Sequence, residues 1–215
     1  IIASLLYVAM NVFVAMQWPA YSSASQTVSE LSAVDAPTRS LWISLAIPYT
    51  VLTAAFGWGV WESAGTNRAL RAAGTSIVTY GVTGLAWPFA PMHLREVLAA
   101  GGATMTDTLH IGFATVTVLI MVLAMVCGAV ALGRRFRLYS IATVVTLAVF
   151  GLLTSLDAPR LEANQPTPWI GVWERINIGV FLLWVVVLAV RLWSGRDAIT
   201  VPAYSQSPPP RRASF

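Results

Sequence analysis

Six long apolar stretches with almost no charged side chains constrain the fold of this sequence more than any other feature. They lie at about residues 1–17, 40–62, 69–90, 107–133, 138–156 and 171–193. Because a helix rises about 1.5 Å per residue, stretches of this length can cross a hydrocarbon core of about 30 Å. Their continuous apolar character does not fit the alternating strands of a membrane barrel. We therefore predict an all-α fold, a polytopic integral membrane bundle of six transmembrane helices.

The composition agrees with this class of protein. Hydrophobic residues make up 57% of the chain and charged residues 10%, whereas soluble domains carry roughly 25% charged residues. The single cysteine, Cys127, lies inside the fourth stretch, so the sequence holds neither a disulfide framework nor a cysteine-based metal site. The net charge of +4 lacks the basic stripe of a nucleic-acid-binding protein, and we expect no nucleic acid partner.

The arginines predict the orientation of the bundle. The chain has no lysine, and its arginines gather in the second and fourth connections and after the last stretch: Arg68, Arg71, Arg134, Arg135, Arg137, Arg191, Arg196, Arg211 and Arg212. Connections rich in arginine stay in the cytoplasm. We therefore expect both termini to be cytoplasmic, with residues 1–193 as the transmembrane domain and residues 194–215 as a cytoplasmic tail rich in Pro, Arg and Ser.

The outer ends of the predicted helices carry a set of acids and imidazoles: Glu30, His93, Asp107, His110 and Glu174. Asp107 and His110 share one face of a helix, because their spacing is close to one helical turn. Ionisable groups at membrane depth cost about 2.5–3.5 kcal/mol on insertion scales, which makes them functional candidates. We expect this cluster of histidines and carboxylates to form one site.

Two kinds of chemistry fit such a cluster. Imidazole and carboxylate ligands suit a divalent metal such as Zn, with His93, His110 and Asp107 as candidate ligands. The metal would acidify a bound water and permit hydrolysis of a lipid-like ester, amide or phosphoester. The candidate catalytic residues are His110, Asp107, Glu174 and Glu30. Without a metal, a histidine–carboxylate pair would act as general base, or Ser29 as nucleophile.

Each candidate residue also has a purely structural alternative. Asp107 stands where the start of a helix favours an acid. Glu174 has Arg175 as its neighbour and would form or join an interfacial salt bridge, and His93 would be a solvated loop residue. His110 differs from these, because an imidazole one turn inside the membrane needs a polar partner or a cavity.

Several short motifs of the chain resemble a known family. They are Ser29-Glu30-Leu31, Pro91-Met92-His93-Leu94-Arg95, Thr106-Asp107-Thr108-Leu109-His110, Pro166-Thr167-Pro168-Trp169 and Trp173-Glu174-Arg175-Ile176-Asn177. Together they resemble the bacterial membrane family called domain of unknown function 998, over nearly the whole chain up to about Trp193. The resemblance implies a compact multi-helix protein of the bacterial cytoplasmic membrane, with no established activity. Its signature polar residues correspond to Glu30, His93, Asp107, His110, Glu174 and Arg175.

A more distant likeness is to membrane hydrolases of the alkaline-ceramidase type, which join Ser, Asp and His residues around zinc. The sequence departs from that pattern, because it lacks a third suitable histidine and a His-x-x-x-His pair. A zinc site of that type is therefore not expected from the resemblance.

Two hypotheses for the function follow. The first is an enzyme or small-ligand site at the outer ends of the helices, which predicts a polar cavity joining the candidate residues. The second is an accessory subunit of a larger, energy-converting membrane complex, in which His110 or His93 at most ligates a pigment or haem. Its partners would be membrane lipids together with other membrane subunits or copies of the same chain. A retinal protein is excluded, because a Schiff base needs a lysine.

Overall fold

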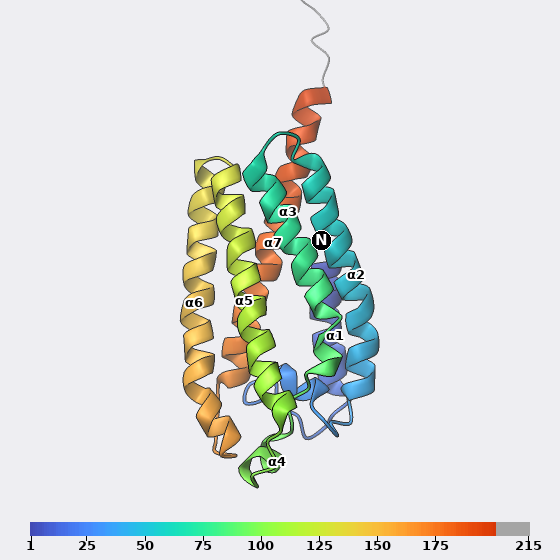
Figure 1. Cartoon of the computed structure of the whole chain (residues 1–215), viewed down its shortest axis with the longest axis vertical. Helices are drawn as coiled ribbons and strands as arrows, with labels where there is room; N and C mark the ends of the chain where they lie inside the picture. Colours follow the sequence, from blue (N-terminus) through green and yellow to red (C-terminus); the bar gives the residue numbers. More distant parts are fainter. Residues whose placement is uncertain (201–215) are drawn as a thin grey trace, which may run out of the picture.

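The computed structural model describes the backbone of residues 1–200 and the side chains of residues 1–194. Within that range the chain is helical and contains no β-strand (Figure 1). Its helices are α1 (Ile2–Met16), α2 (Arg39–Ser63), α3 (Arg68–Gly84), α4 (Arg95–Ala99), α5 (Met105–Ala131), α6 (Arg134–Glu162) and α7 (Ile170–Thr200). Two short 3₁₀ helices, η1 (Ser29–Ser32) and η2 (Trp87–Phe89), lie in the connections. The all-α prediction is confirmed for the described residues.

Each of the six predicted apolar stretches coincides with one helix, and the additional helix, α4, is short. Four helices, α2, α5, α6 and α7, are long and apolar enough to cross a membrane. The other two are shorter, with 15 residues in α1 and 17 in α3. Helix α3 ends at Gly84, whereas the third stretch was predicted to reach residue 90. Residues 85–90 instead form a turn and η2, where Pro88 prevents continuation of a regular helix.

Two other helices extend beyond their predicted ends. Helix α6 begins at Arg134 and ends at Glu162, because its polar first and last turns remain helical outside the apolar stretch at 138–156. Helix α7 continues to Thr200, past the predicted end of the last stretch at 193. The rest of the predicted tail, residues 201–215, lies outside the described residues.

Helices α2 and α3 form an antiparallel hairpin whose backbones approach closely. A Cβ atom on Gly74 would lie 2.6 Å from the backbone nitrogen of Trp61, so only glycine fits at this position. Small residues at helix interfaces allow such contact in membranes, where packing must replace the hydrophobic drive between helices. Helix α5 packs on α3, and α6 packs on α5 and α7. The α2–α3 and α5–α6 hairpins therefore meet directly through α3 and α5, and α7 packs mainly on α6 (Figure 1).

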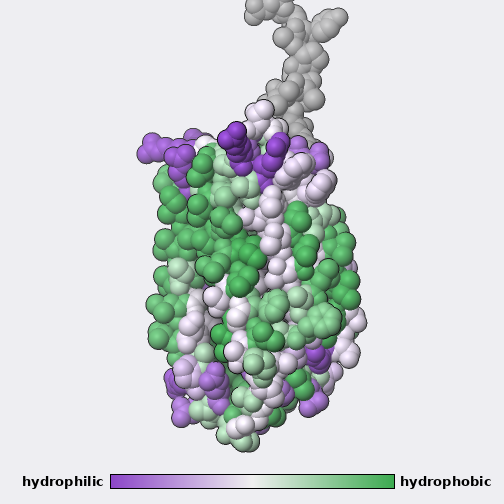
Figure 2. Space-filling view, in the orientation of Figure 1, coloured by the Kyte–Doolittle hydropathy of each residue, from purple (hydrophilic) through white to green (hydrophobic). Residues whose placement is uncertain are grey.

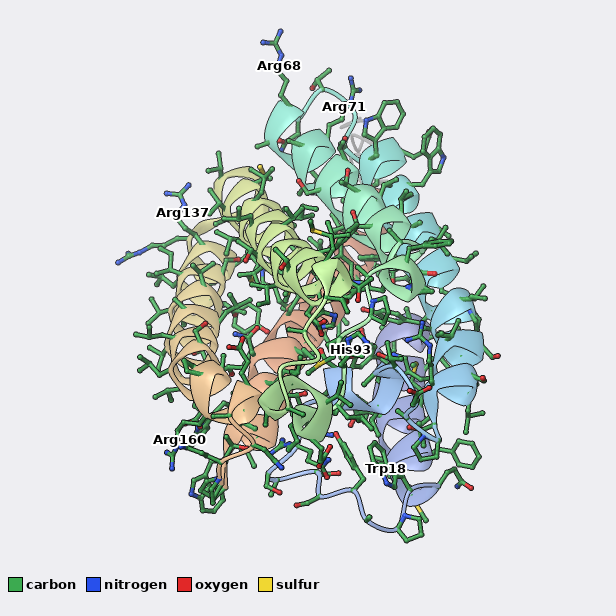
Figure 3. All side chains as sticks on the ribbon, turned by 60° about the horizontal axis from the view of Figure 1, so that its bottom comes forward. Trp18, Arg68, Arg71, His93, Arg137 and Arg160 are labelled. Carbon is green, nitrogen blue, oxygen red and sulfur yellow. The ribbon has the colours of Figure 1, made fainter. Side chains whose placement is uncertain are left out.

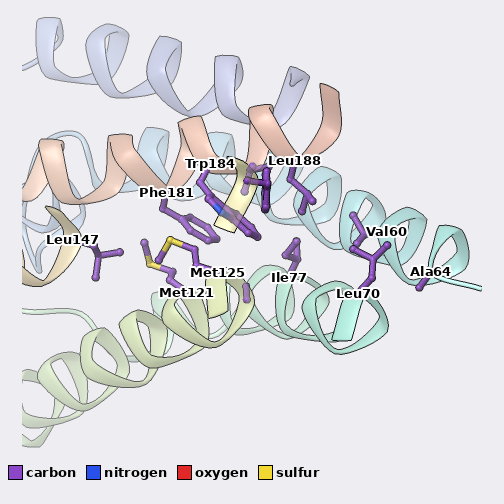
Figure 4. Close-up of a cluster of buried hydrophobic side chains, with 13 residues drawn as sticks. Val60, Ala64, Leu70, Ile77, Met121, Met125, Leu147, Phe181, Trp184 and Leu188 are labelled. Carbon is purple, nitrogen blue, oxygen red and sulfur yellow. The ribbon is translucent and has the colours of Figure 1, made fainter. Parts of the chain in front are cut away.

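The main hydrophobic core fills the half of the bundle next to the α2–α3 connection. Its buried members include Val60, Leu70, Ile77, Met125, Phe181, Trp184 and Leu188 (Figure 4). The indole N–H of Trp184 donates to Ser140 Oγ at 2.9 Å, which satisfies the only polar atom of this side chain. The predicted site residues lie in the opposite half.

The outer surface of the bundle has an apolar belt between two polar ends (Figure 2). Exposed apolar side chains cover α5 and α6, among them Leu119, Leu123, Val130, Ile141, Val145 and Leu152. Arg68, Arg71 and Arg137 lie at one end of the bundle, and Trp18 and His93 lie toward the other (Figure 3). Such a belt is the surface expected of a protein in lipid, and the predicted site lies at the end opposite the arginine-rich connections.

Candidate ligand-binding site

The end of the bundle that carries the candidate residues is closed by the connections 17–38, 85–104 and 163–169. Glu30 and Arg95 join them. Arg95 Nε lies 2.9 Å from Glu30 Oε1, and Arg95 Nη2 lies 2.9 Å from Glu30 Oε2. Arg95 also donates to Thr167 Oγ1 at 3.1 Å. The Glu30 side chain is fully buried, and its carboxylate also accepts the Thr27 N–H at 2.7 Å. The geometry of Glu30 is thus that of a buried structural ion pair.

Asp107 connects the start of α5 to the loop that precedes α4. It accepts the His93 N–H at 2.7 Å, and His93 Nδ1 lies 2.8 Å from its other oxygen. It also accepts the Thr104 N–H at 2.8 Å, which forms a capping box with Thr104 as the N-cap. The capping role expected for Asp107 is therefore present, one turn inside the helix. The predicted solvation of His93 is wrong, because its side chain is only 17% exposed and is held by Asp107.

His110 is held differently from His93. Its Nδ1 lies 2.9 Å from the carbonyl oxygen of Ala90, and a carbonyl oxygen can only accept a hydrogen bond. Nδ1 therefore carries the hydrogen, and in the neutral ring Nε2 is left as the acceptor. The ring of Trp87 meets the imidazole edge-on at 4.9 Å between centroids. His110 thus has the fixed orientation that a binding or proton-accepting histidine needs.

Glu174 and Arg175 point to different partners. The Glu174 carboxylate accepts the Val28 N–H and the Ser29 hydroxyl, the latter at 3.3 Å. Arg175 instead donates to Asn11 Oδ1 at 3.1 Å and to the Tyr21 hydroxyl at 2.6 Å. The predicted Glu174–Arg175 salt bridge is therefore not formed. Burial raises the pKa of Tyr21 above its ordinary value, so this hydroxyl stays protonated and donates to the Thr27 carbonyl.

A cavity of about 1090 Å³ occupies this half of the bundle. Its wall is mostly apolar and includes Ile47, Ile111, Val118 and Leu147. Its polar lining residues include Ser29, Arg39, Asp107, His110, Glu174 and Asn177. Helices α2, α3, α5, α6 and α7 contribute most of the wall, α1 contributes Tyr7, and α4 contributes Leu98. The structure therefore brings Asp107, His110 and Glu174 to one cavity and leaves Glu30 outside its lining.

The predicted metal centre is not formed among the described residues. No group of three or more His, Cys, Asp or Glu side chains in residues 1–194 is arranged to hold a metal ion. Of the predicted ligands, His93 and Asp107 meet, but they meet as a hydrogen-bonded pair. His110 directs Nδ1 to the Ala90 carbonyl instead of toward that pair. The Nδ1 atoms of both histidines and the Asp107 carboxylate are thus engaged in hydrogen bonds within the protein.

Two arginines in this part of the molecule were not predicted as site residues. Arg95 neutralises Glu30, and Arg39 lines the cavity. Arg39 is the first residue of α2, at the end of the bundle opposite the arginine-rich connections, and in the predicted orientation the positive-inside rule disfavours arginine there. An arginine at that predicted end is a sequence signal for a specific role, which Arg39 shares with Arg95, Arg160 and Arg175.

The family comparison agrees with the motifs described above. The family model described as "Protein of unknown function (DUF998)" matches residues 1–191. No curated protein and no solved structure matches the chain. Because the family model covers nearly all of the sequence, the chain belongs to the DUF998 family, whose description assigns no activity.

Proposed function

We propose that the protein binds an amphiphilic small molecule from the bilayer in the cavity between its helices. The observation that carries the proposal is the cavity of about 1090 Å³, which combines a long apolar wall with polar groups at one end. Ligand sites of drug or lipid size have volumes of about 300–1,000 Å³ and this type of lining. An apolar chain fits along Ile47, Val118 and Leu147, while a polar head reaches Ser29, His110 and Glu174.

The proposal includes the topology that the sequence predicts. Helices α1 and α3 complete six spans with the four long helices, and both termini lie in the cytoplasm of a bacterial cell. The clustering of Arg68, Arg71 and Arg137 at one end of the bundle supports this orientation (Figure 3). The cavity then lies in the outer half of the membrane, open to lipids of the outer leaflet.

His110 supplies the best-defined polar contact for a ligand. Since Nδ1 is held by the Ala90 carbonyl, Nε2 accepts a hydrogen bond from a hydroxyl, amine or water in the cavity. The same atom would serve as a general base, without a metal, if the ligand carried an ester or amide bond. The experiment on the purified protein should therefore measure lipid hydrolysis as well as lipid binding.

Mass spectrometry of lipids that remain bound to the detergent-purified protein tests the proposal. Ala114 lines the cavity, so Ala114→Phe fills part of the volume and should displace the bound molecule. Ala142→Phe is the matched control, because Ala142 lies on the exposed face of α6. A defined bound amphiphile in the native protein and the control, lost in Ala114→Phe, supports the proposal. Equal lipid content in all three samples contradicts it and favours the accessory-subunit hypothesis.

A further inference from the structure

Two opposite charges, Arg39 and Glu174, line the cavity at the two ends of a single short turn. The turn is η1, Ser29–Ser32. Glu174 holds the backbone N–H of Val28 and the hydroxyl of Ser29, just before and at its start. Arg39 donates through Nη1 to the carbonyl of Ser32, at its end. The same element therefore fixes both charges.

Neither charge forms an ion pair within residues 1–194. Both partners of the Glu174 carboxylate, the Val28 N–H and the Ser29 hydroxyl, are neutral donors. Arg39 likewise donates to two neutral carbonyl oxygens, those of Ser32 and Pro88, the latter at 3.1 Å. Charged groups next to an apolar cavity are costly unless a counter-charge compensates them. The two residues therefore present a carboxyl group and a guanidinium group, each without a counter-charge, to a molecule that enters the cavity.

The other charged residues near the cavity are excluded as partners of a ligand, and Arg175, whose partners are also neutral, does not line the cavity. Asp107 is paired with His93, and Glu30 is paired with Arg95. Glu162 also lines the cavity, but it lies at the exposed end of α6. Arg39 and Glu174 are thus the charges that a bound molecule can compensate.

The two side chains are held at backbone positions that lie close together on η1. A 3₁₀ helix rises about 2 Å per residue, so the backbone positions that Glu174 and Arg39 contact are on the order of 8 Å apart. A molecule that bridges them carries an anionic group and a cationic group a few bonds apart. Its apolar part lies along the wall formed by Ile47, Val118 and Leu147.

We infer that the ligand is a zwitterionic phospholipid whose ammonium group binds Glu174 and whose phosphate binds Arg39. Arginine matches phosphate through its planar fork of donors, and a carboxylate pairs with an ammonium group by charge-assisted hydrogen bonds. The inference rests on the proposed function, because it identifies the class of amphiphile that the same cavity binds. It adds that the head group selects the lipid.

Competition between two lipids with identical acyl chains tests the inference. The purified protein is equilibrated with equal amounts of phosphatidylethanolamine, which is zwitterionic, and phosphatidylglycerol, which is anionic, and the bound lipid is quantified by mass spectrometry. The native protein should prefer phosphatidylethanolamine by about tenfold, the ratio that one charge-assisted contact of about 1.4 kcal/mol confers. Glu174→Gln should abolish this preference while lipid remains bound.

Arg39 is tested by two variants. Arg39→Gln should lower the binding of both phospholipids. Arg39→Lys, which keeps the positive charge, should retain part of the phospholipid binding of the native protein. This second variant tests the role of the charge even if Arg39→Gln folds poorly. Glu96→Gln is the control for lost negative charge, because Glu96 lies exposed on α4 and does not line the cavity. Its lipid preference should equal that of the native protein.

The outcomes separate this inference from the proposed function. Bound lipid without head-group preference in the native protein overturns the inference and leaves the proposed function intact. Absence of any bound lipid overturns both. Soluble phosphoethanolamine, which has the same two charges without acyl chains, distinguishes the source of the head group. If it binds the lipid-depleted protein as tightly as the phospholipid does, the assignment to a membrane lipid is wrong.

Discussion

Arg95 and Glu30 form a two-point ion pair that fastens the connection 85–104 to the connection 17–38. Both nitrogen–oxygen distances are 2.9 Å, and the side chains are 11% and 0% exposed. The residues are 65 positions apart in the sequence. Their pairing closes the end of the bundle above the cavity, since Arg95 also reaches the carbonyl of Ser25 and the hydroxyl of Thr167.

Glu30→Gln should destabilise the protein strongly, because it leaves the Arg95 charge buried without a counter-charge. Breaking a buried pair from one side costs about 3–5 kcal/mol. Thermal unfolding in detergent micelles measures the effect, with Glu96→Gln as the control for an exposed acid on α4. If Glu30→Gln has the same unfolding temperature as the native protein but no longer binds ligand, Glu30 acts in the site and our structural assignment is wrong.

Gly171→Ala should disrupt the contact between α7 and the connection 17–38. A Cβ atom there would lie 2.2 Å from the carbonyl oxygen of Gln26, and backbone atoms cannot move aside cheaply. We expect the free energy of unfolding to fall by about 1–3 kcal/mol. Gly179→Ala, in the same helix, meets nothing within 4 Å and should have little effect. Similar unfolding temperatures for the two variants would contradict this packing.

Asp107→Ala should cost more stability than Thr104→Ala. Thr104→Ala removes the N-cap of α5, which is worth about 1 kcal/mol. Asp107→Ala removes the other half of the capping box and both contacts to His93, for which we expect about 1–3 kcal/mol in addition. Hydrogen exchange should show the loop at 90–94 opening in Asp107→Ala and staying protected in Thr104→Ala. Equal protection in both variants would mean that Asp107 does not hold the loop.

The six-span topology predicts which connections are reached from outside the cell. In a Cys127→Ser background, Ala100→Cys lies at the end of the cavity half, and Thr66→Cys lies in the α2–α3 connection; both positions are exposed. A membrane-impermeant thiol reagent should label Ala100→Cys in intact cells and label Thr66→Cys only after the membrane is broken. The reverse pattern would invert the orientation, and labelling of both positions in intact cells would contradict an odd number of spans between them.

Helix positions were predictable because lipid imposes a length and an apolar composition on any helix that crosses it. Each predicted stretch overlaps one helix. The errors lie at the helix ends, where polar turns stay helical, as in α6, or where the helix stops before Pro88, as in α3. Length and hydropathy alone identify four spans, because α1 and α3 are short. Family membership was also predictable, from short polar motifs in the connections and at the ends of the apolar helices.

The grouping of site residues was only partly predictable. Asp107 and His110 lie on one helix, and their shared approach to the cavity follows from helical periodicity. The place of Arg39 in the cavity and the withdrawal of Glu30 into an ion pair do not follow from periodicity, because each depends on how distant connections fold over one another.

The sequence alone determined that this chain forms apolar helices and that its histidines and most of its buried acids stand at one end of them. The tertiary structure decided which of these groups meet. In the folded protein Glu30 pairs with Arg95, Asp107 pairs with His93, and Glu174 accepts hydrogen bonds from neutral donors beside the cavity. The physical reason is that hydropathy and helical periodicity describe one segment at a time. An ion pair depends on which segments pack against each other, and hydropathy does not predict that.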